Sequence, residues 1–211
     1  MPDTKSTKIT IERPALQLRS QEKRRRLVKA GFQIFARDGY KDARIADIAK
    51  ESGISVGAFY HRFGDKRGFF QVLLIEYTNR GKENWELFFK YADLNWSAAE
   101  LFDKLVAGEA RAIDRNMGFF SAYLSLGRKD TALAAPMKEM DRHGANLLLE
   151  HLRARSKSPL DLDLETVHFA INSIGKILVI SSVMEGSKFK AQDPTTIREV
   201  ALMIRRYLAI E

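Results

Sequence analysis

The chain has 211 residues, of which 45% are hydrophobic and 29% charged, a composition typical of a globular protein with a sizeable core. It contains no cysteine, which excludes disulfide frameworks, thiol nucleophiles and zinc–cysteine sites and fits a reducing compartment. Residues 1–70 hold 16 Lys and Arg against 8 Asp and Glu, whereas residues 71–211 hold 19 basic and 19 acidic residues. A basic part joined to a neutral part indicates a polyanion partner for the first, although a merely solvated basic surface would have the same composition.

The start of the chain predicts no targeting segment. Residues 1–14 are polar and lack the apolar run of a signal peptide. The most apolar stretch, residues 177–184, is much shorter than the roughly 20 residues of a membrane-spanning helix. We therefore expect a cytoplasmic protein. We interpret residues 1–18, which are basic, as a flexible arm.

Two helices and a tight turn are predicted next. The first covers residues 20–38, with Ser20 as its N-cap and Gly39 in the left-handed conformation at its end. A short second helix is expected over residues 45–52, followed by a turn at Gly53.

A third short helix over residues 56–63 completes the order of elements found in a helix-turn-helix. Ser55 is suited to cap it, and Phe59 and Phe63, one turn apart, are predicted to be buried. Gly64 ends it, and Asp65 is expected to cap the next helix. The remaining helices are predicted over residues 66–91, 97–115, 117–128, 136–155, 164–185 and 194–210.

The face of the third helix opposite the phenylalanines is predicted to enter the major groove of DNA. Small residues at its start allow a close approach to base edges, where Val56 and Ala58 can meet a thymine methyl group. Tyr60 is suited to a phosphate hydrogen bond, and His61 to phosphate or guanine. The residues predicted to contact DNA are Arg44, Ser55, Val56, Gly57, Ala58, Tyr60, His61 and Lys66.

Residues 27–70 resemble, without a gap, the amino-terminal domain of TetR-type bacterial transcriptional regulators. The matching elements are Phe35-Ala36, Gly39-Tyr40, Ile48-Ala49, Gly53-Ile54-Ser55, Gly57, Phe59-Tyr60, Phe63 and Lys66. The resemblance implies an all-α homodimer, usually a repressor, in which an effector bound to the carboxy-terminal domain changes the separation of the two recognition helices. One departure is Arg44, where the family usually has a threonine or serine that caps the second helix and contacts phosphate; here Asp42 or a water would have to cap.

The all-α chain is accordingly divided into a helix-turn-helix domain, residues 19–66, and a larger effector-binding and dimerisation domain, residues 67–211. The helix over residues 164–185 is apolar on more than one face, which indicates either a second covering partner or a wholly buried central helix. Two such helices from each subunit would form a four-helix interface. The predicted interface residues are Ile171, Ile174, Leu178, Val183, Ile197, Val200, Ile204, Tyr207 and Leu208.

An effector pocket is predicted among the middle helices, lined by aromatic and sulfur-containing side chains with a few polar groups to orient a small apolar or aromatic ligand. Each of these aromatic residues, taken alone, is more often ordinary core than pocket wall. The predicted lining consists of Trp85, Phe88, Phe89, Phe102, Phe119, Phe120, Tyr123, Met137, Met140, His143, His168 and Asn172, with Asn116 as a further polar candidate.

Enzymatic activity is not expected. No two histidines have the four-residue spacing of a helical metal site, and the sequence contains neither a glycine-rich phosphate loop nor a Ser-centred nucleophile turn. We expect no metal and no cofactor. The expected partners are double-stranded DNA, a second copy of the chain and a small effector. An architectural or partner-recruiting DNA-binding protein remains the alternative, and it would have a packed second domain without a cavity.

Overall fold

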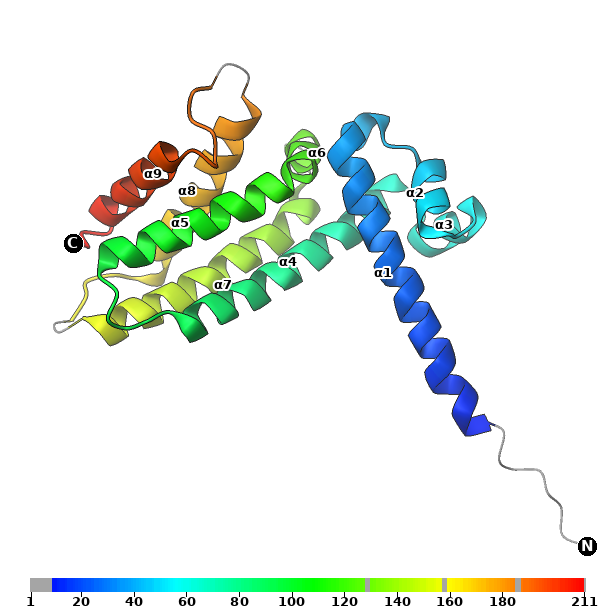
Figure 1. Ribbon diagram of the computed structural model, residues 1–211, viewed down its shortest axis with the longest axis horizontal. Coiled ribbons are helices and arrows are strands. Elements are labelled where there is room, and N and C mark those ends of the chain that lie inside the picture. Colours follow the sequence, from blue (N-terminus) through cyan, green and yellow to red (C-terminus); the bar gives the residue numbers. More distant parts are fainter. Residues whose placement is uncertain (1–8, 128–129, 157–158, 185–186, 211) are drawn as a thin grey trace, which may run out of the picture. The chain divides into compact units, whose positions relative to one another are not determined.

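The computed structural model (Figure 1) describes residues 9–127, 130–156, 159–184 and 187–210. All regular elements of this described part are helices, in the order α1 (Ile9–Asp42), α2 (Ile45–Ser52), α3 (Val56–Phe63), α4 (Lys66–Tyr91), α5 (Ala98–Arg115), α6 (Met117–Gly127), α7 (Thr131–Arg155), α8 (Leu164–Val183) and α9 (Pro194–Tyr207). The chain divides into two compact units, Met1–Leu73 and Leu74–Glu211. The division falls inside α4, later than the boundary at residue 66 that the sequence predicted.

An aromatic cluster forms the core of the first unit. Phe35, Phe59 and Phe69 are fully buried, and the rings of Phe59 and Phe69 lie 4.9 Å apart at a steep angle. Phe63 is only half-buried, although its ring also lies 4.9 Å from that of Phe69. An added Cβ at Gly31 would lie 2.7 Å from the Phe69 ring, so α1 can pack this closely only because it has glycine there.

Glycines end the short helices where the sequence predicted. The backbone of α1 departs from helical geometry at Gly39, with φ 70°, and Gly53 follows α2 with φ 71° and ψ 34°. Both conformations lie in the left-handed region, which a residue with a Cβ rarely adopts. Asp65 Oδ1 accepts a hydrogen bond from the Gly68 amide at 2.6 Å, which confirms its predicted capping of α4.

Two predicted helix starts are wrong. Helix α1 begins at Ile9 rather than after a cap at Ser20, so residues 9–18 of the predicted arm are helical; residues 1–8 lie outside the described part. The stretch 15–19 is rich in the helix formers Ala, Leu, Gln and Arg and has no glycine, so an internal serine does not interrupt it.

Helix α7 begins at Thr131 rather than at Pro136, which lies inside the helix. Asp130 caps α7 by accepting a hydrogen bond from the Ala132 amide at 3.1 Å. The alanine-rich turn that follows has high helix propensity, and its Leu133 is fully buried. Together these features favour an earlier start than the proline alone indicated.

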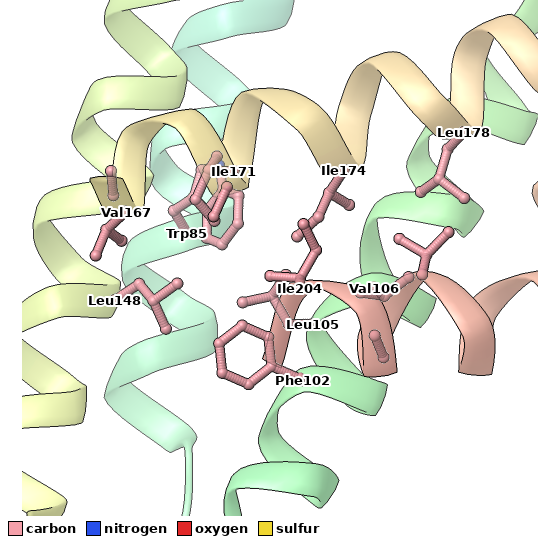
Figure 2. Packing of buried hydrophobic residues seen from close by; sticks show 14 of the residues in the cluster. Trp85, Phe102, Leu105, Val106, Leu148, Val167, Ile171, Ile174, Leu178 and Ile204 are labelled. Atoms are coloured by element: carbon pink, nitrogen blue, oxygen red, sulfur yellow. The ribbon is translucent and has the colours of Figure 1, made fainter. Parts of the chain in front are cut away.

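The second unit is a bundle in which α8 packs along α7 and α9 packs along α5. Figure 2 shows Ile171, Ile174 and Leu178 of α8 directed toward Leu105 of α5 and Ile204 of α9. All five side chains are buried in one hydrophobic cluster. By length and composition alone α8 could cross a membrane, yet one of its faces lies in this core, as in the central helix of a globular domain.

Candidate nucleic-acid interface and effector cavity

Helix α3 presents a continuous exposed face next to a buried anchor. Ser55 begins the helix, and its Oγ accepts a hydrogen bond from the Ala58 amide at 3.1 Å. Phe59 is fully buried, whereas 49% of Tyr60 is exposed. The structure brings six of the predicted contact residues together on this exposed face: Ser55, Val56, Gly57, Ala58, Tyr60 and His61.

Arg44 immediately precedes α2 but does not cap it. The α2 N-terminus has no side-chain capping hydrogen bond, so Asp42 does not supply the cap that the sequence analysis considered. The Arg44 side chain is 78% exposed, and its Nε donates a hydrogen bond to Asp47 Oδ2 at 2.8 Å. The terminal guanidinium nitrogens make no hydrogen bond within the described residues, which leaves them able to reach a phosphate.

Lys66 has a structural role that the sequence analysis missed. Its Nζ donates hydrogen bonds to the carbonyl oxygens of Lys41 and Ala43, each at 3.0 Å, and lies 4.9 Å from the centroid of the Tyr40 ring. These bonds tie the loop between α1 and α2 to the start of α4. Asp65 already places a carboxylate at the N-terminus of α4, where the helix dipole favours an anion, so a group of the chain itself occupies this position. Contact of Lys66 with phosphate stays a prediction.

The second unit contains a cavity of about 610 Å³. Its wall combines apolar side chains with an unusual number of polar ones. Residues from α4 to α8 line it: Tyr77, Glu109, Ile113, Phe120, Tyr123, Leu124, Ala134, Met137, Lys138, Met140, Asp141, Glu165, His168, Phe169, Asn172, Gly175, Lys176, Val179 and Ile180. Such a volume lies within the usual range for a site that encloses a small molecule.

Half of the predicted pocket residues line this cavity, namely Phe120, Tyr123, Met137, Met140, His168 and Asn172. The others are placed elsewhere. Trp85, Phe102 and Phe119 are buried core residues, while Phe88 and Phe89 pack against that core. His143 lies 3.1 Å from Glu86 through Nε2, and Asn116 donates a hydrogen bond to the Ala112 carbonyl. Helical spacing identifies an inward-facing aromatic residue but does not distinguish a cavity wall from solid core.

The sequence analysis missed three carboxylates that line the cavity, Glu109, Asp141 and Glu165, and the first two have raised pKa values. Burial, together with the charge of Asp141, raises the pKa of Glu109 to about 7. Burial also raises the pKa of Asp141, against the effect of Asn172, whose Nδ2 donates a hydrogen bond to Asp141 Oδ2 at 2.7 Å. The sequence carried a signal: Glu109 lies four residues from both Leu105 and Ile113, on the buried face of α5.

Tyr77 is another ionisable group of the cavity wall that the sequence analysis overlooked. Its pKa is raised mainly by burial, with Glu109 and Asp141 adding to the effect. The phenol therefore stays neutral. Within the described part of the chain, no group of three or more His, Asp or Glu side chains is arranged to hold a metal ion.

The predicted dimer residues are divided between core and surface. Six of the nine are buried inside the chain itself and are not available to a partner: Ile171, Ile174, Leu178, Val200, Ile204 and Leu208. Ile197 is partly buried, while Val183 and Tyr207 are exposed. These six residues face the core because α8 and α9 are apolar on their core side, and an interface formed by the two helices stays a prediction.

Three further apolar side chains are exposed on these helices: Phe169 and Ile180 on α8 and Met203 on α9. The ring of Phe169 lies 5.5 Å from that of Tyr207, which joins the two helices at the surface. We call Phe169, Ile180, Val183, Met203 and Tyr207 the outer face. It is the part of α8 and α9 that a partner could cover.

A capped, exposed helix following a tight glycine turn, anchored by one buried phenylalanine, defines a DNA-binding protein of the helix-turn-helix class. Residues 27–73 match the family described as bacterial regulatory proteins, tetR family. The HTH-type transcriptional regulator YdgC of Bacillus subtilis is 27% identical over 170 residues, which are 79% of this chain and 84% of YdgC.

Two solved structures show the same fold. A tetR-family transcriptional regulator from Streptomyces coelicolor superposes with a TM-score of 0.70 at 17% identity, covering 88% of this chain and 82% of that one. FadR from Bacillus subtilis, in complex with stearoyl-CoA, superposes with a TM-score of 0.63 at 18% identity, covering 85% of this chain and 96% of FadR. The amino-terminal domain of the chain is a tetR-family DNA-binding domain, and the whole chain shares the fold of solved tetR-family structures.

Proposed function

We propose that this regulator is a repressor that binds an inverted-repeat operator through α3 and leaves it when a small molecule occupies the cavity of the second unit. The observation that carries this proposal is the exposed face of α3, from Ser55 to His61, beside the fully buried Phe59. The positive charge concentrated in residues 1–70 supports a duplex partner. The protein would act at the nucleoid in the bacterial cytoplasm.

Operator symmetry follows from the assembly. Two copies joined across the outer face by a two-fold axis would present two recognition helices, which match two half-sites of opposite orientation. The outer face supports this assembly because its side chains are large, apolar and solvent-exposed: 60% of Phe169 and 51% of Tyr207 are accessible in the single chain.

The cavity favours an effector-controlled repressor over an architectural protein. The architectural alternative predicts a packed second domain, whereas this unit encloses about 610 Å³. The stearoyl-CoA complex of FadR is a property of that protein, but it supports the idea that the fold can accommodate a ligand. Aromatic and sulfur-containing side chains such as Phe120 and Met137 suit a ligand with an apolar or aromatic body.

Selection of bound sites from random duplexes tests the DNA-binding part of the proposal. We expect the purified chain to enrich an inverted repeat and to retain it against heparin at moderate salt. His61→Ala should change the selected sequence, since base contacts determine the choice of site. If no duplex is preferred over the competitor, the regulatory function is refuted.

Sedimentation velocity tests the assembly. Tyr207→Asp should shift the protein from dimer to monomer, because it places a charge in the centre of an apolar contact. Tyr91→Asp is the matched control, since Tyr91 is also an exposed tyrosine at the end of a helix of the second unit. Equal dimer populations in the two variants would place the interface elsewhere.

Release by effector is tested separately. In a thermal-shift screen of apolar and aromatic compounds, those that bind should raise the melting temperature of the protein. Each of these compounds should then weaken operator affinity in a gel-shift titration. Operator affinity that is unchanged by every bound compound would contradict control by release.

A further inference from the structure

Two carboxylates that line the cavity, Glu109 from α5 and Asp141 from α7, lie close enough for their charges to interact. Glu109 receives no hydrogen bond from the described residues, and the nearby charge it experiences is that of Asp141, which has the same sign. A buried anion without a partner is costly to the fold. The Glu109 carboxylate therefore lacks a compensating positive charge or a hydrogen bond within the described residues.

A second polar group faces the same space without a full set of partners. His168 of α8 lines the cavity and is only 9% exposed, and its Nε2 has no hydrogen-bond partner in the described structure. Its Nδ1 lies 3.9 Å from Glu165, which itself forms an ion pair with Arg142 at 2.7 Å. Asn172, by contrast, is engaged with Asp141.

The cations among the lining residues do not neutralise Glu109. Lys138 and Lys176 line the cavity with solvent-exposed side chains. Lys176 acts on Asp141, where its charge opposes the rise in pKa, whereas the charge that acts on Glu109 is the negative charge of Asp141. The negative charge of Glu109 can therefore be neutralised only by a cationic ligand or by protonation.

The cavity wall also has a large apolar part. Ile113, Leu124, Met137 and Val179, from four different helices, contribute to it. A ligand that fits must combine an apolar body with one group that complements negative charge.

We propose that the effector is an organic base, whose cationic amine or ammonium group lies against Glu109 and Asp141 and whose apolar body lies against the apolar part of the wall. This inference rests on the proposed function, in which the cavity is the effector site. It restricts the proposed class of effectors from apolar or aromatic compounds in general to those that also carry a positive charge.

Charge decides between the candidate ligand classes. A carboxylate or phosphate ligand would add a further negative charge beside Glu109 and Asp141, whereas an ammonium group would form ion pairs with these two half-buried carboxylates. A neutral ligand could accept a hydrogen bond from protonated Glu109, but it would add no positive charge to the hydrogen bond from Asn172 and the charges of His168 and Lys176 that already act on Asp141. The cation is the class that satisfies both groups.

Isothermal titration with three probes tests the inference: 4-phenylbutylamine, 4-phenylbutanol and 4-phenylbutanoate. They share one apolar body and differ only in the charge of the head group. We expect the amine to bind at least tenfold more tightly than the alcohol and the carboxylate to bind most weakly. In Glu109→Gln and in Asp141→Asn the amine should lose about tenfold in affinity, while the alcohol should change by less than twofold.

Asp103→Asn is the matched control, because Asp103 is an exposed carboxylate on the same helix. It should leave all three affinities unchanged. Equal binding of amine and alcohol, tighter binding of the carboxylate, or binding of none of the probes would overturn the inference. Operator binding measured without any probe is independent of these results, so failure of the ligand class is distinguishable from failure of the regulatory function.

Discussion

Helices α3 and α8 use apolar residues in opposite ways. In α3 only Phe59 is fully buried, and the opposite face is exposed from Val56 to His61. In α8 seven residues are buried, and large apolar side chains such as Phe169 and Ile180 are nevertheless exposed on the other side. One helix therefore has a core side and a polar or small-residue side, whereas the other has apolar residues in the core, along a cavity and at the surface.

The two helices differ in how far their exposed surfaces depend on the packing of other helices. The α3 surface is set by local features: a serine cap, two glycines and one phenylalanine. The surroundings of α8 are determined by four other helices, since α5, α6, α7 and α9 all contact it. Mutations can separate these two situations, and the largest effect is expected at the α3 anchor.

Phe59→Ala should unfold or strongly destabilise the first unit. Truncating a fully buried phenylalanine leaves a cavity beside Phe69 and costs about 3–5 kcal/mol. Urea unfolding followed by circular dichroism would measure the loss. If Phe59→Ala were as stable as the neighbouring Tyr60→Ala, the proposed division of α3 into an anchor and a free face would be wrong.

Glu109→Gln should change the pH dependence of stability in the second unit. The pKa of Glu109 rises from 4.5 in the unfolded chain to about 7 in the folded one, so its contribution is complete below pH 4.5 and is lost as the pH rises to 7. The wild type should lose up to about 3 kcal/mol more than the variant between pH 4.5 and pH 8.

Urea titrations at the two pH values, monitored by the fluorescence of Trp85 and Trp96, which both lie in the second unit, would give this difference. Asp141 also has a raised pKa and should leave a residual slope of the same sign in Glu109→Gln. Asp103→Asn serves again as the exposed control. Identical pH profiles for the wild type and Glu109→Gln would show that the carboxylate is not buried.

Lys66→Met should lower the unfolding free energy by about 2 kcal/mol, because two backbone carbonyls lose a charged donor. Lys50→Met, at an exposed position of α2, should have little effect on stability. The slope of operator affinity against salt gives a second readout. A slope reduced by about one would mean that Lys66 contacts a phosphate as well.

Tyr60→Ala should weaken binding to all duplexes by about 1 kcal/mol without changing stability, because its hydroxyl is predicted to donate to a phosphate. Tyr60→Phe separates the hydroxyl from the ring and should show most of the same loss. Fluorescence anisotropy with the selected operator and with a scrambled duplex would measure both. A loss confined to the operator would indicate base contact instead.

Local features made much of the first unit predictable. The bounds of α2, α3 and α4 agree with those expected from the sequence, since Gly53, Gly64 and the capping residues Ser55 and Asp65 mark their ends. The start of α1 was not predictable in this way, because Pro14, which lies inside the helix, argues from the sequence against a helix that begins as early as Ile9.

In the second unit, the periodicity of apolar residues did not predict which side chains line the cavity. Its spacing correctly indicated helices, but Trp85 and Phe102 have the same apolar pattern as Phe120, and only the last lines the cavity. Whether an inward side chain meets another side chain or an empty space depends on how neighbouring helices pack. The same limit applies to Ile174, which was expected at an interface and lies in the core (Figure 2).

Phe169 and Ile180 belong both to the cavity wall and to the outer face. A molecule inside the cavity and a second subunit on α8 would therefore compete for, or jointly fix, the rotamers of the same two side chains. Thermodynamic reciprocity then requires that each binding event alter the affinity of the other by one common factor. The concentration of protein at which the effector is titrated should consequently enter its apparent dissociation constant.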